Sequence, residues 1–264
     1  MAMLKMTHAF ARPRAVTTCF RALRRPCLGA FLAMVIALAP GTAPAEQPVV
    51  VELFTSQGCS SCPPADRLIG ELAMRDDVIA LSLHVDYWDY IGWKDPFGSP
   101  QNTERQRRYA EELGLRYVYT PQIVIDGRLN VVGSRRGEVL AGIRAAAKKA
   151  KTVEVIFEPD DGGRVIIPAG HAPERGATIW LAVYDRSFET EVKRGENAGR
   201  TIENTHVVRR MERLGTWTGA RLEIPLNLDS ASTRDNYGCA VIVQQGRNGP
   251  IIGAGLMHLD TLSN

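Results

Sequence analysis

The sequence predicts an α/β domain followed by a β-rich domain, and three observations indicate this division. An apolar run at residues 49–54 predicts a buried strand, and a short turn leads from it to Cys59 and Cys62, which open an amphipathic helix. Strand and helix patterns then alternate as far as residue 150. Beyond that point only short strand patterns follow, separated by Gly, Asp and Pro clusters.

The order of elements in the first part predicts its fold. After the cysteine helix we expect a strand, a helix, a strand hairpin and a last helix, at residues 78–85, 101–113, 119–133 and 138–150. The hairpin turns at Asp126-Gly127, the strongest short turn signal in the chain. The resulting order β-α-β-α-β-β-α is that of a thioredoxin fold, with a parallel strand pair, an antiparallel hairpin and helices on both faces.

The second part lacks any convincing long helix. Its expected strands lie at residues 152–158, 164–167, 177–185, 205–214, 220–226 and 238–245. Such a series is typical of an antiparallel sandwich. The predicted fold class is therefore an α/β thioredoxin-like domain, residues 46–150, followed by an antiparallel β-sandwich-like domain, residues 151–264.

The N-terminus has the pattern of a cleaved export signal. Six basic residues and no acid precede an apolar run at residues 28–39, and an A-x-A site follows, so we expect residues 1–45 to be a signal peptide. The apolar run is short for a membrane span. We expect a periplasmic or secreted protein with no stable membrane anchor after cleavage. Because the six cations exceed the net charge of +3, the remainder is slightly acidic, which argues against nucleic-acid binding.

The chemistry of the two cysteines depends on where they stand. A thiol at a helix N-terminus is stabilised as a thiolate by free N–H groups and the helix dipole, which makes Cys59 the expected nucleophile. With two residues between the cysteines, Cys62 is placed to resolve a mixed disulfide. No second cysteine pair exists to complete a zinc site, and we expect no metal and no cofactor. Cys239 lies in a buried strand pattern and is expected to be an inert core thiol.

Several other residues are candidates for the same site. Thr120 and Pro121 open a strand that this order of elements places beside the cysteine helix, where a cis Pro121 and the Thr120 backbone would position a thiol partner. Glu52, on the strand that leads in, is a possible proton carrier for Cys62, although it could equally point to solvent. Asp66 is interpreted as a first-turn acid that complements the helix dipole.

Two polar or aromatic loops have open interpretations. The loop at residues 86–100 is long for a compact domain, and its Trp88, Tyr90 and Trp93 form either a substrate rim or ordinary packing. The polar residues at 193–209, around two glycines, either face the cysteines, bind an anion or form a solvated hairpin loop, and we slightly favour the solvated loop.

Long motifs in the chain resemble a known family. Residues 52–66, 84–97 and 119–122, together with residues 193–200 and 206–209, are similar to a secreted bacterial thioredoxin-like family that is catalogued as domain of unknown function 1223. The resemblance covers nearly the whole expected mature chain and implies the fold and export. It implies no particular reaction. Gly58 stands where thioredoxins usually have tryptophan, and the neutral Ser60-Ser61 pair leaves the direction of electron flow open.

The preferred function is an exported thiol–disulfide oxidoreductase that acts on a protein or small-thiol substrate through Cys59 and Cys62. The alternative is a non-catalytic exported binding protein on the same scaffold. In that case the cysteine pair is a structural disulfide or a copper(I) ligand pair.

Overall fold

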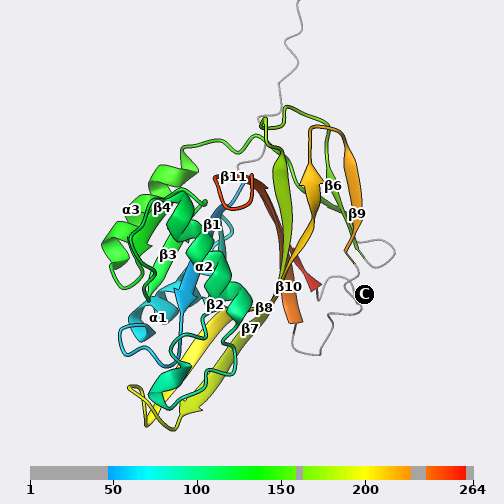
Figure 1. The fold of residues 1–264 in the computed structure, drawn as a ribbon. Helices are drawn as coiled ribbons and strands as arrows, with labels where there is room; N and C mark the ends of the chain where they lie inside the picture. The colour runs from blue at the N-terminus through cyan, green and yellow to red at the C-terminus, as the bar shows by residue number, and fades with distance from the viewer. Residues whose placement is uncertain (1–46, 159–162, 227–235, 260–264) are drawn as a thin grey trace, which may run out of the picture. The chain divides into compact units, whose positions relative to one another are not determined.

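The protein is described by a computed structural model over residues 47–158, 163–226 and 236–259 (Figure 1). The segment expected to be a signal peptide, residues 1–45, lies outside the described residues. Within the described ranges, no helix is both long enough and apolar enough to cross a lipid bilayer.

The first half contains the expected order of strands and helices. Its elements are β1 (Val49–Thr55), α1 (Pro63–Leu72), β2 (Val78–His84), η1 (Asp89–Ile91), α2 (Pro100–Glu112), β3 (Gln122–Ile125), β4 (Leu129–Val132) and α3 (Arg136–Ala147). Strand β1 pairs in parallel with β2 and antiparallel with β3, which continues into β4. The turn between β3 and β4 is at Asp126 and Gly127, whose φ angles of 46° and 63° are both left-handed, as Asp-Gly hairpins require.

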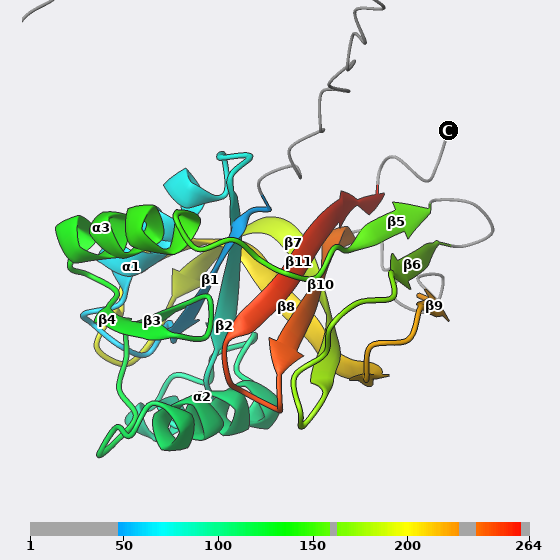
Figure 2. The same cartoon turned by 90° about the horizontal axis from the view of Figure 1, so that it is seen from above.

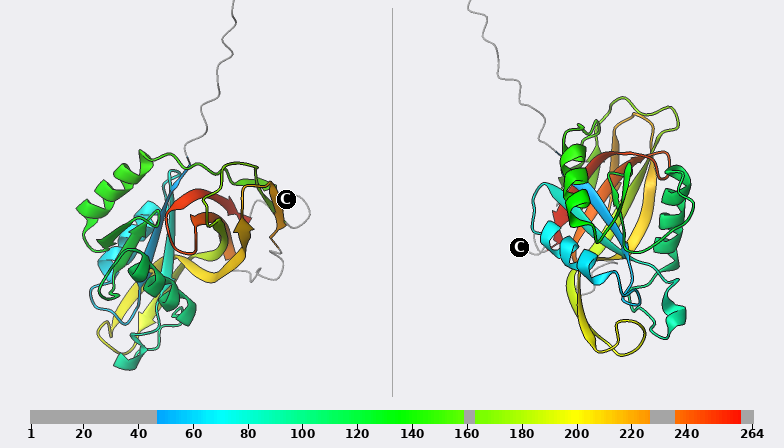
Figure 3. Two further views of the ribbon diagram at one scale, coloured as in Figure 1. Left: turned by 45° about the horizontal axis from the view of Figure 1, so that its top comes forward. Right: turned by 90° about the vertical axis from the view of Figure 1, so that its left-hand side faces the viewer.

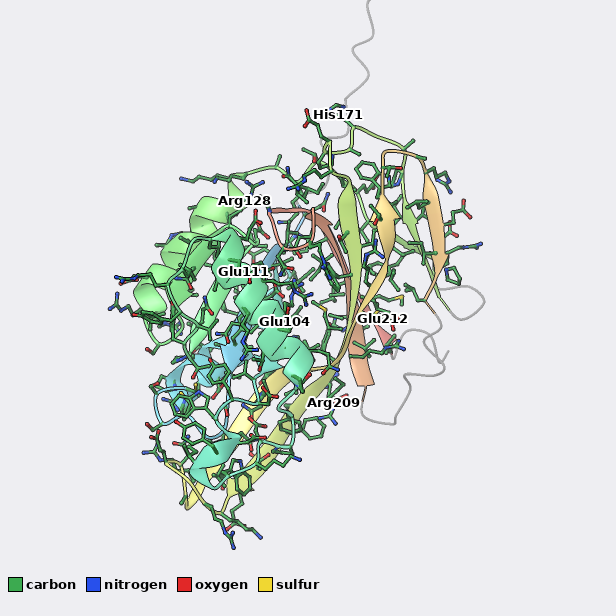
Figure 4. The ribbon with its side chains drawn as sticks, viewed as in Figure 1. Glu104, Glu111, Arg128, His171, Arg209 and Glu212 are labelled. Atoms are coloured by element: carbon green, nitrogen blue, oxygen red, sulfur yellow. The ribbon has the colours of Figure 1, made fainter. Side chains whose placement is uncertain are left out.

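The helices cover both faces of these strands (Figure 2). Helices α1 and α3 share one core with β1 and β3, in which Leu68 and Ile69 of α1 contact the apolar residues of the sheet. Helix α2 covers the other face, where the buried Tyr109 packs edge-on against Phe54. The opposite side of α2 is polar and includes the exposed Glu104 and Glu111 (Figure 4). Helix α1 is thus held mainly by apolar side chains, whereas the buried face of α2 is largely polar and includes Asn102, Arg105 and Gln106.

The second half contributes seven strands. They are β5 (Ile156–Glu158), β6 (Arg164–Ile167), β7 (Ala177–Val192), β8 (Arg200–Trp217), β9 (Leu222–Pro225), β10 (Asn236–Gln245) and β11 (Ile251–His258). Strands β5, β6 and β9 form a three-stranded sheet whose buried side chains pack on those of β7 and β10. The other four strands join those of the first half in one sheet of order β11-β10-β7-β8-β2-β1-β3-β4.

The large sheet runs across the domain boundary expected near residue 150. Strand β8 lies parallel to β2 with Val207 opposite Ser82, and Ser82 Oγ donates a 2.7 Å hydrogen bond to the Thr205 carbonyl. The described residues all belong to a single compact unit. The described structure is thus a mixed α/β unit with one large sheet, and its division into two domains stays a prediction.

Two features of the second half differ from expectation. Strands β7 and β8 are much longer than predicted and continue as a hairpin through residues 186–204, as Figure 3 shows. Their outer part has one exposed side rich in charge, which hides the strand pattern. Strand β11 was not predicted because its glycines resemble a loop. At Gly253 a Cβ would lie 2.3 Å from the Val153 carbonyl oxygen, so the close backbone approach requires glycine there.

Candidate functional site

The cysteine turn joins β1 to α1. The Cys59 N–H donates to the Ser56 carbonyl at 3.1 Å, and the Cys62 N–H donates to the Cys59 carbonyl at 3.2 Å. Cys62 is the N-cap residue of α1, and prolines occupy the first two helical positions. Proline suits these positions because their N–H groups have no partner within the helix. The sequence therefore starts the helix directly after the second cysteine.

The two thiols are not joined in a disulfide, and their pKa values are shifted in opposite directions. Hydrogen bonding from Cys62 lowers the pKa of Cys59 to about 6, with help from Ser61 and Thr120, although burial opposes this shift. Burial, and then the bond to Cys59, raises the pKa of Cys62 well above its usual value. At neutral pH the pair therefore holds a thiolate on Cys59 and a proton on Cys62. Cys59 is only 1% exposed and Cys62 is fully buried.

Thr120 and Pro121 lie beside this pair. The peptide bond between them is cis, as expected from the sequence. The Thr120 side chain hydrogen-bonds to Cys59 and accepts a 2.8 Å hydrogen bond from Trp88 Nε1. The cysteine turn and the residues just before β3 therefore meet at Cys59 Sγ.

The contacts of Glu52 argue against a role as proton carrier for Cys62. The Glu52 carboxylate is fully buried and receives hydrogen bonds from Arg105 at 2.6 and 3.1 Å and from the Tyr109 hydroxyl at 2.5 Å. Gln244 completes this cluster by contacting both Arg105 and Tyr109. Glu52 is thus one half of a buried ion pair that joins β1, α2 and β10.

Asp66 is the carboxyl group beside the thiols, and the sequence interpretation missed this role. Thr55 Oγ1 donates a 2.7 Å hydrogen bond to Asp66 Oδ1, and Thr55 also hydrogen-bonds to Cys62. Burial raises the pKa of Asp66 to about 7, against the lowering effects of His84 and Thr55. Its second oxygen is buried with no hydrogen-bond partner. The i, i+4 spacing from Cys62 was the available signal, because it places both residues on one helix face.

A buried histidine lies close behind Asp66. His84 Nδ1 is 2.7 Å from Asp95 Oδ2, and the same oxygen accepts a 2.8 Å hydrogen bond from the Gln57 N–H. Although burial opposes it, the nearby Asp95 raises the pKa of His84. Arg209, labelled in Figure 4, lies over the ring of Phe97 at 5.2 Å and completes the polar surroundings of this pair. Among the described residues, no group of three or more metal-ligating His, Cys, Asp and Glu side chains is present.

The three aromatic candidates have different environments. Trp88 is half-buried and binds Thr120, and Trp93 Nε1 donates a 3.1 Å hydrogen bond to Gln57 Oε1. Tyr90 is 82% exposed. Trp88 also explains Gly58, since a Cβ there would lie 3.2 Å from the Trp88 Cβ. The aromatic loop therefore both packs on the cysteine turn and presents one exposed ring.

The tip of the β7–β8 hairpin also contacts the cysteine turn. Asn197 Nδ2 donates 2.9 Å hydrogen bonds to the carbonyl oxygens of Gln57 and Cys59, and Glu196 Oε2 accepts a 3.1 Å hydrogen bond from the Ser60 N–H. Hydrogen bonds from the Ser60 side chain and then from its N–H lower the pKa of Glu196. The slightly favoured interpretation of this segment as a solvated loop is therefore wrong at its centre. By contrast, Cys239 is fully buried in β10, and burial raises its pKa to about 12.

Comparisons with known proteins show what this chain is similar to. The crystal structure of a protein from Agrobacterium tumefaciens superposes with a TM-score of 0.70 at 33% sequence identity, covering 81% of this chain and 96% of that one. A protein named probable thioredoxin from Archaeoglobus fulgidus is 28% identical over 85 residues, which are 32% of this chain and 74% of that one. A family model described as a protein of unknown function (DUF1223) matches residues 50–244, which include both cysteines and the hairpin tip, and the chain belongs to this family.

Proposed function

We propose that the protein is an exported thiol–disulfide oxidoreductase on a thioredoxin-like scaffold, with Cys59 as the nucleophile and Cys62 as the resolving thiol. The observation that carries this proposal is the asymmetry of the pair. One thiol donates a hydrogen bond to the other at the start of α1, so the outer sulfur is an anion at neutral pH while the inner one keeps its proton.

The reaction follows from this asymmetry. The Cys59 thiolate attacks one sulfur of a partner disulfide, so that a Cys59–partner S–S bond forms and the leaving sulfur takes up a proton. Cys62 then loses its proton, its sulfur attacks Cys59 Sγ, and the partner's remaining sulfur leaves as a thiol. Two electrons pass to the partner and the pair becomes a disulfide. The reverse sequence oxidises a partner dithiol.

Asp66 is the proposed acceptor of the Cys62 proton. The Thr55 hydroxyl bonds to both Cys62 and Asp66, so a proton leaving the thiol has a short route to the carboxylate. A carboxyl group with a pKa of about 7 exchanges protons readily at neutral pH. Glu52, held by Arg105, contributes to stability instead.

The scaffold assignment rests on strand order. The β2-β1-β3-β4 part of the sheet, with helices on both faces, has the order and directions that the thioredoxin fold requires, and the sequence likeness to a probable thioredoxin supports it. The β-rich second half extends this sheet, and we propose that it contributes to partner choice through the hairpin tip.

The partner we propose is a protein with an accessible thiol or disulfide, met in the periplasm or outside the cell. The exposed Tyr90 ring and the Trp88–Thr120 contact beside Cys59 support a rim that grips such a partner. Because Cys59 is 1% exposed, the partner must displace side chains of this rim or of the hairpin tip to reach its sulfur. Nucleic acid and a membrane anchor have no part in the proposal.

The deciding experiment uses cysteine variants of the full chain. We expect the reduced protein to exchange with glutathione disulfide, Cys59→Ser to abolish exchange, and Cys62→Ser to accumulate a mixed disulfide on Cys59. Cys239→Ser, which removes a buried thiol far from α1, is the matched control and keeps wild-type exchange. A wild-type pair that resists millimolar thiol, with Cys59 unreactive to alkylation after forced reduction, would contradict the proposal. Stoichiometric copper(I) bound by such an unreactive pair would favour the binding-protein alternative.

A further inference from the structure

The turn that carries Cys59 is held from outside by the β7–β8 hairpin. Cys62, the N-cap residue, makes no side-chain capping bond of its own. The carbonyl oxygens of Gln57 and Cys59 both accept hydrogen bonds from Asn197 Nδ2 at 2.9 Å. One amide group thus bridges the Gln57–Gly58 and Cys59–Ser60 peptide units, which flank the peptide bond that leads into the proposed nucleophile.

The orientation of the Asn197 amide follows from its partners. The two carbonyl oxygens can only accept hydrogen bonds, whereas Arg200 Nη1, 3.2 Å from Asn197 Oδ1, can only donate. All three contacts are satisfied in one orientation and none in the flipped one. The Asn197 side chain is completely buried, so no water replaces these bonds.

The hairpin tip is itself rigidly placed. Gly195 and Gly199 both have a φ of 77°, a conformation that favours glycine, and the Gly199 N–H closes the loop by donating to the Val192 carbonyl at 2.8 Å. A Cβ on Gly195 would lie 3.3 Å from the Trp93 Cβ, so the tip rests directly on the aromatic loop. A second bond, from Gln57 Nε2 to Asn204 Oδ1 at 2.9 Å, links the same turn to β8.

We propose that Asn197 is a positioning residue of the cysteine site, which fixes the turn so that Cys59 stays within hydrogen-bond reach of Cys62, Ser61 and Thr120. It does not touch the sulfur and acts through the Gln57 and Cys59 carbonyl oxygens. The inference rests on the proposed function only in taking Cys59 as the nucleophile. It also assigns a task to the second half of the chain, because a residue more than a hundred positions away sets the geometry of the reactive thiol.

The experiment measures thiolate formation, which a residue needed only for stability would not alter. In the reduced Cys239→Ser background, the absorbance of the Cys59 thiolate at 240 nm is followed against pH for wild type, Asn197→Leu and Glu203→Ala. Leucine keeps the approximate shape of asparagine without donors or charge. Glu203 is exposed on the same hairpin and serves as the matched control. We expect Asn197→Leu to raise the midpoint by about one pH unit or more, and Glu203→Ala to leave it unchanged.

The outcomes separate the inference from the proposed function. A folded Asn197→Leu protein whose midpoint stays within about 0.3 pH units of wild type would overturn the positioning role while leaving the oxidoreductase proposal intact. A wild-type midpoint near the ordinary thiol value would instead overturn the proposed function. If Asn197→Leu does not fold, Asn197→Ser, which keeps one hydroxyl donor in place of two, gives the test. An upward shift in that variant supports the role, and a wild-type midpoint overturns it.

Discussion

The 2.7 Å hydrogen bond from Thr55 Oγ1 to Asp66 Oδ1 connects the end of β1 to the first turn of α1. Because Thr55 also hydrogen-bonds to Cys62, these residues form a continuous path from the inner thiol to a buried acid. Burial is the main reason that the pKa of Asp66 is raised toward neutral pH. The carboxyl group can therefore both hold and release a proton under physiological conditions.

Replacing Asp66 with Asn should slow the second chemical step. Without the carboxylate, the Cys62 proton has no nearby base, and we expect release of the second thiol from a Cys59 mixed disulfide to slow about ten-fold or more. Stopped-flow measurement with an aromatic disulfide separates this phase from the initial attack, which should change little. Asp76→Asn, at an exposed acid just after α1, is the control. An unchanged second phase in Asp66→Asn would show that Cys62 loses its proton by another route.

The same substitution should change how stability depends on pH. The pKa of Asp66 rises from 3.8 to about 7 on folding, so its stabilising contribution is present below pH 4 and is lost as the pH rises through 7. Relative to Asp66→Asn, we expect the unfolding free energy of reduced wild type to fall by roughly 2–4 kcal/mol between pH 4 and pH 8. Urea unfolding at the two pH values measures the difference. Parallel curves for the two proteins would mean that Asp66 is ionised throughout this range.

The features that the sequence predicted are those that depend on contiguous residues. The strand, turn and cysteine helix follow one another without a break in the sequence. The β3–β4 turn is predictable from Asp126-Gly127 because these two residues readily adopt the left-handed backbone conformation that it requires. The sequence does not show from which face of its strand Glu52 projects. All seven residues of β1 are buried, so the alternation that distinguishes the two faces of a strand is absent.

Long-range polar contacts set the remainder of the site and leave little trace in sequence. The bonds of Asn197 span 140 and 138 residues, and the tip around it has the polar and glycine-rich composition of a solvated loop. Asp66 was visible at the correct spacing from Cys62, but a first-turn acid also favours the helix dipole, and nothing in the sequence shows that it is buried.

Glu52→Gln should lower the free energy of unfolding and leave the titration of Cys59 unchanged. The change leaves Arg105 buried with no full counter-charge, which typically costs about 3 kcal/mol. Urea unfolding at pH 7 tests this cost, and the pH midpoint of Cys59 alkylation should remain at the wild-type value near 6. If Glu52→Gln instead slowed the second phase of exchange while retaining full stability, Glu52 would be the proton carrier after all.

Tyr90→Ala should weaken reactions with protein partners more than those with small thiols. The ring is 82% exposed, so its removal takes away little packing within the fold and mainly removes apolar surface available to a partner. We expect KM for a reduced or disulfide-bonded protein partner to rise about three- to ten-fold, with kcat and the glutathione reaction unchanged. Met74→Ala, at an equally exposed residue that follows the far end of α1, controls for loss of apolar surface. Equal effects of the two substitutions would exclude Tyr90 from the rim.

Glu196→Gln should change the preference of Cys59 between anionic and cationic disulfides. Glu196 places a carboxylate on the Ser60 N–H, next to the nucleophile, where it repels anionic partners. Glutamine can still accept that hydrogen bond, so the substitution isolates the charge. We expect the rate of the reduced protein with glutathione disulfide, relative to that with the cationic disulfide cystamine, to rise about two- to three-fold at low ionic strength. In 0.5 M salt this ratio should return toward the wild-type value, because the carboxylate is exposed and salt screens its charge. A ratio that is the same in both proteins at low salt would mean that Glu196 acts through its hydrogen bond alone.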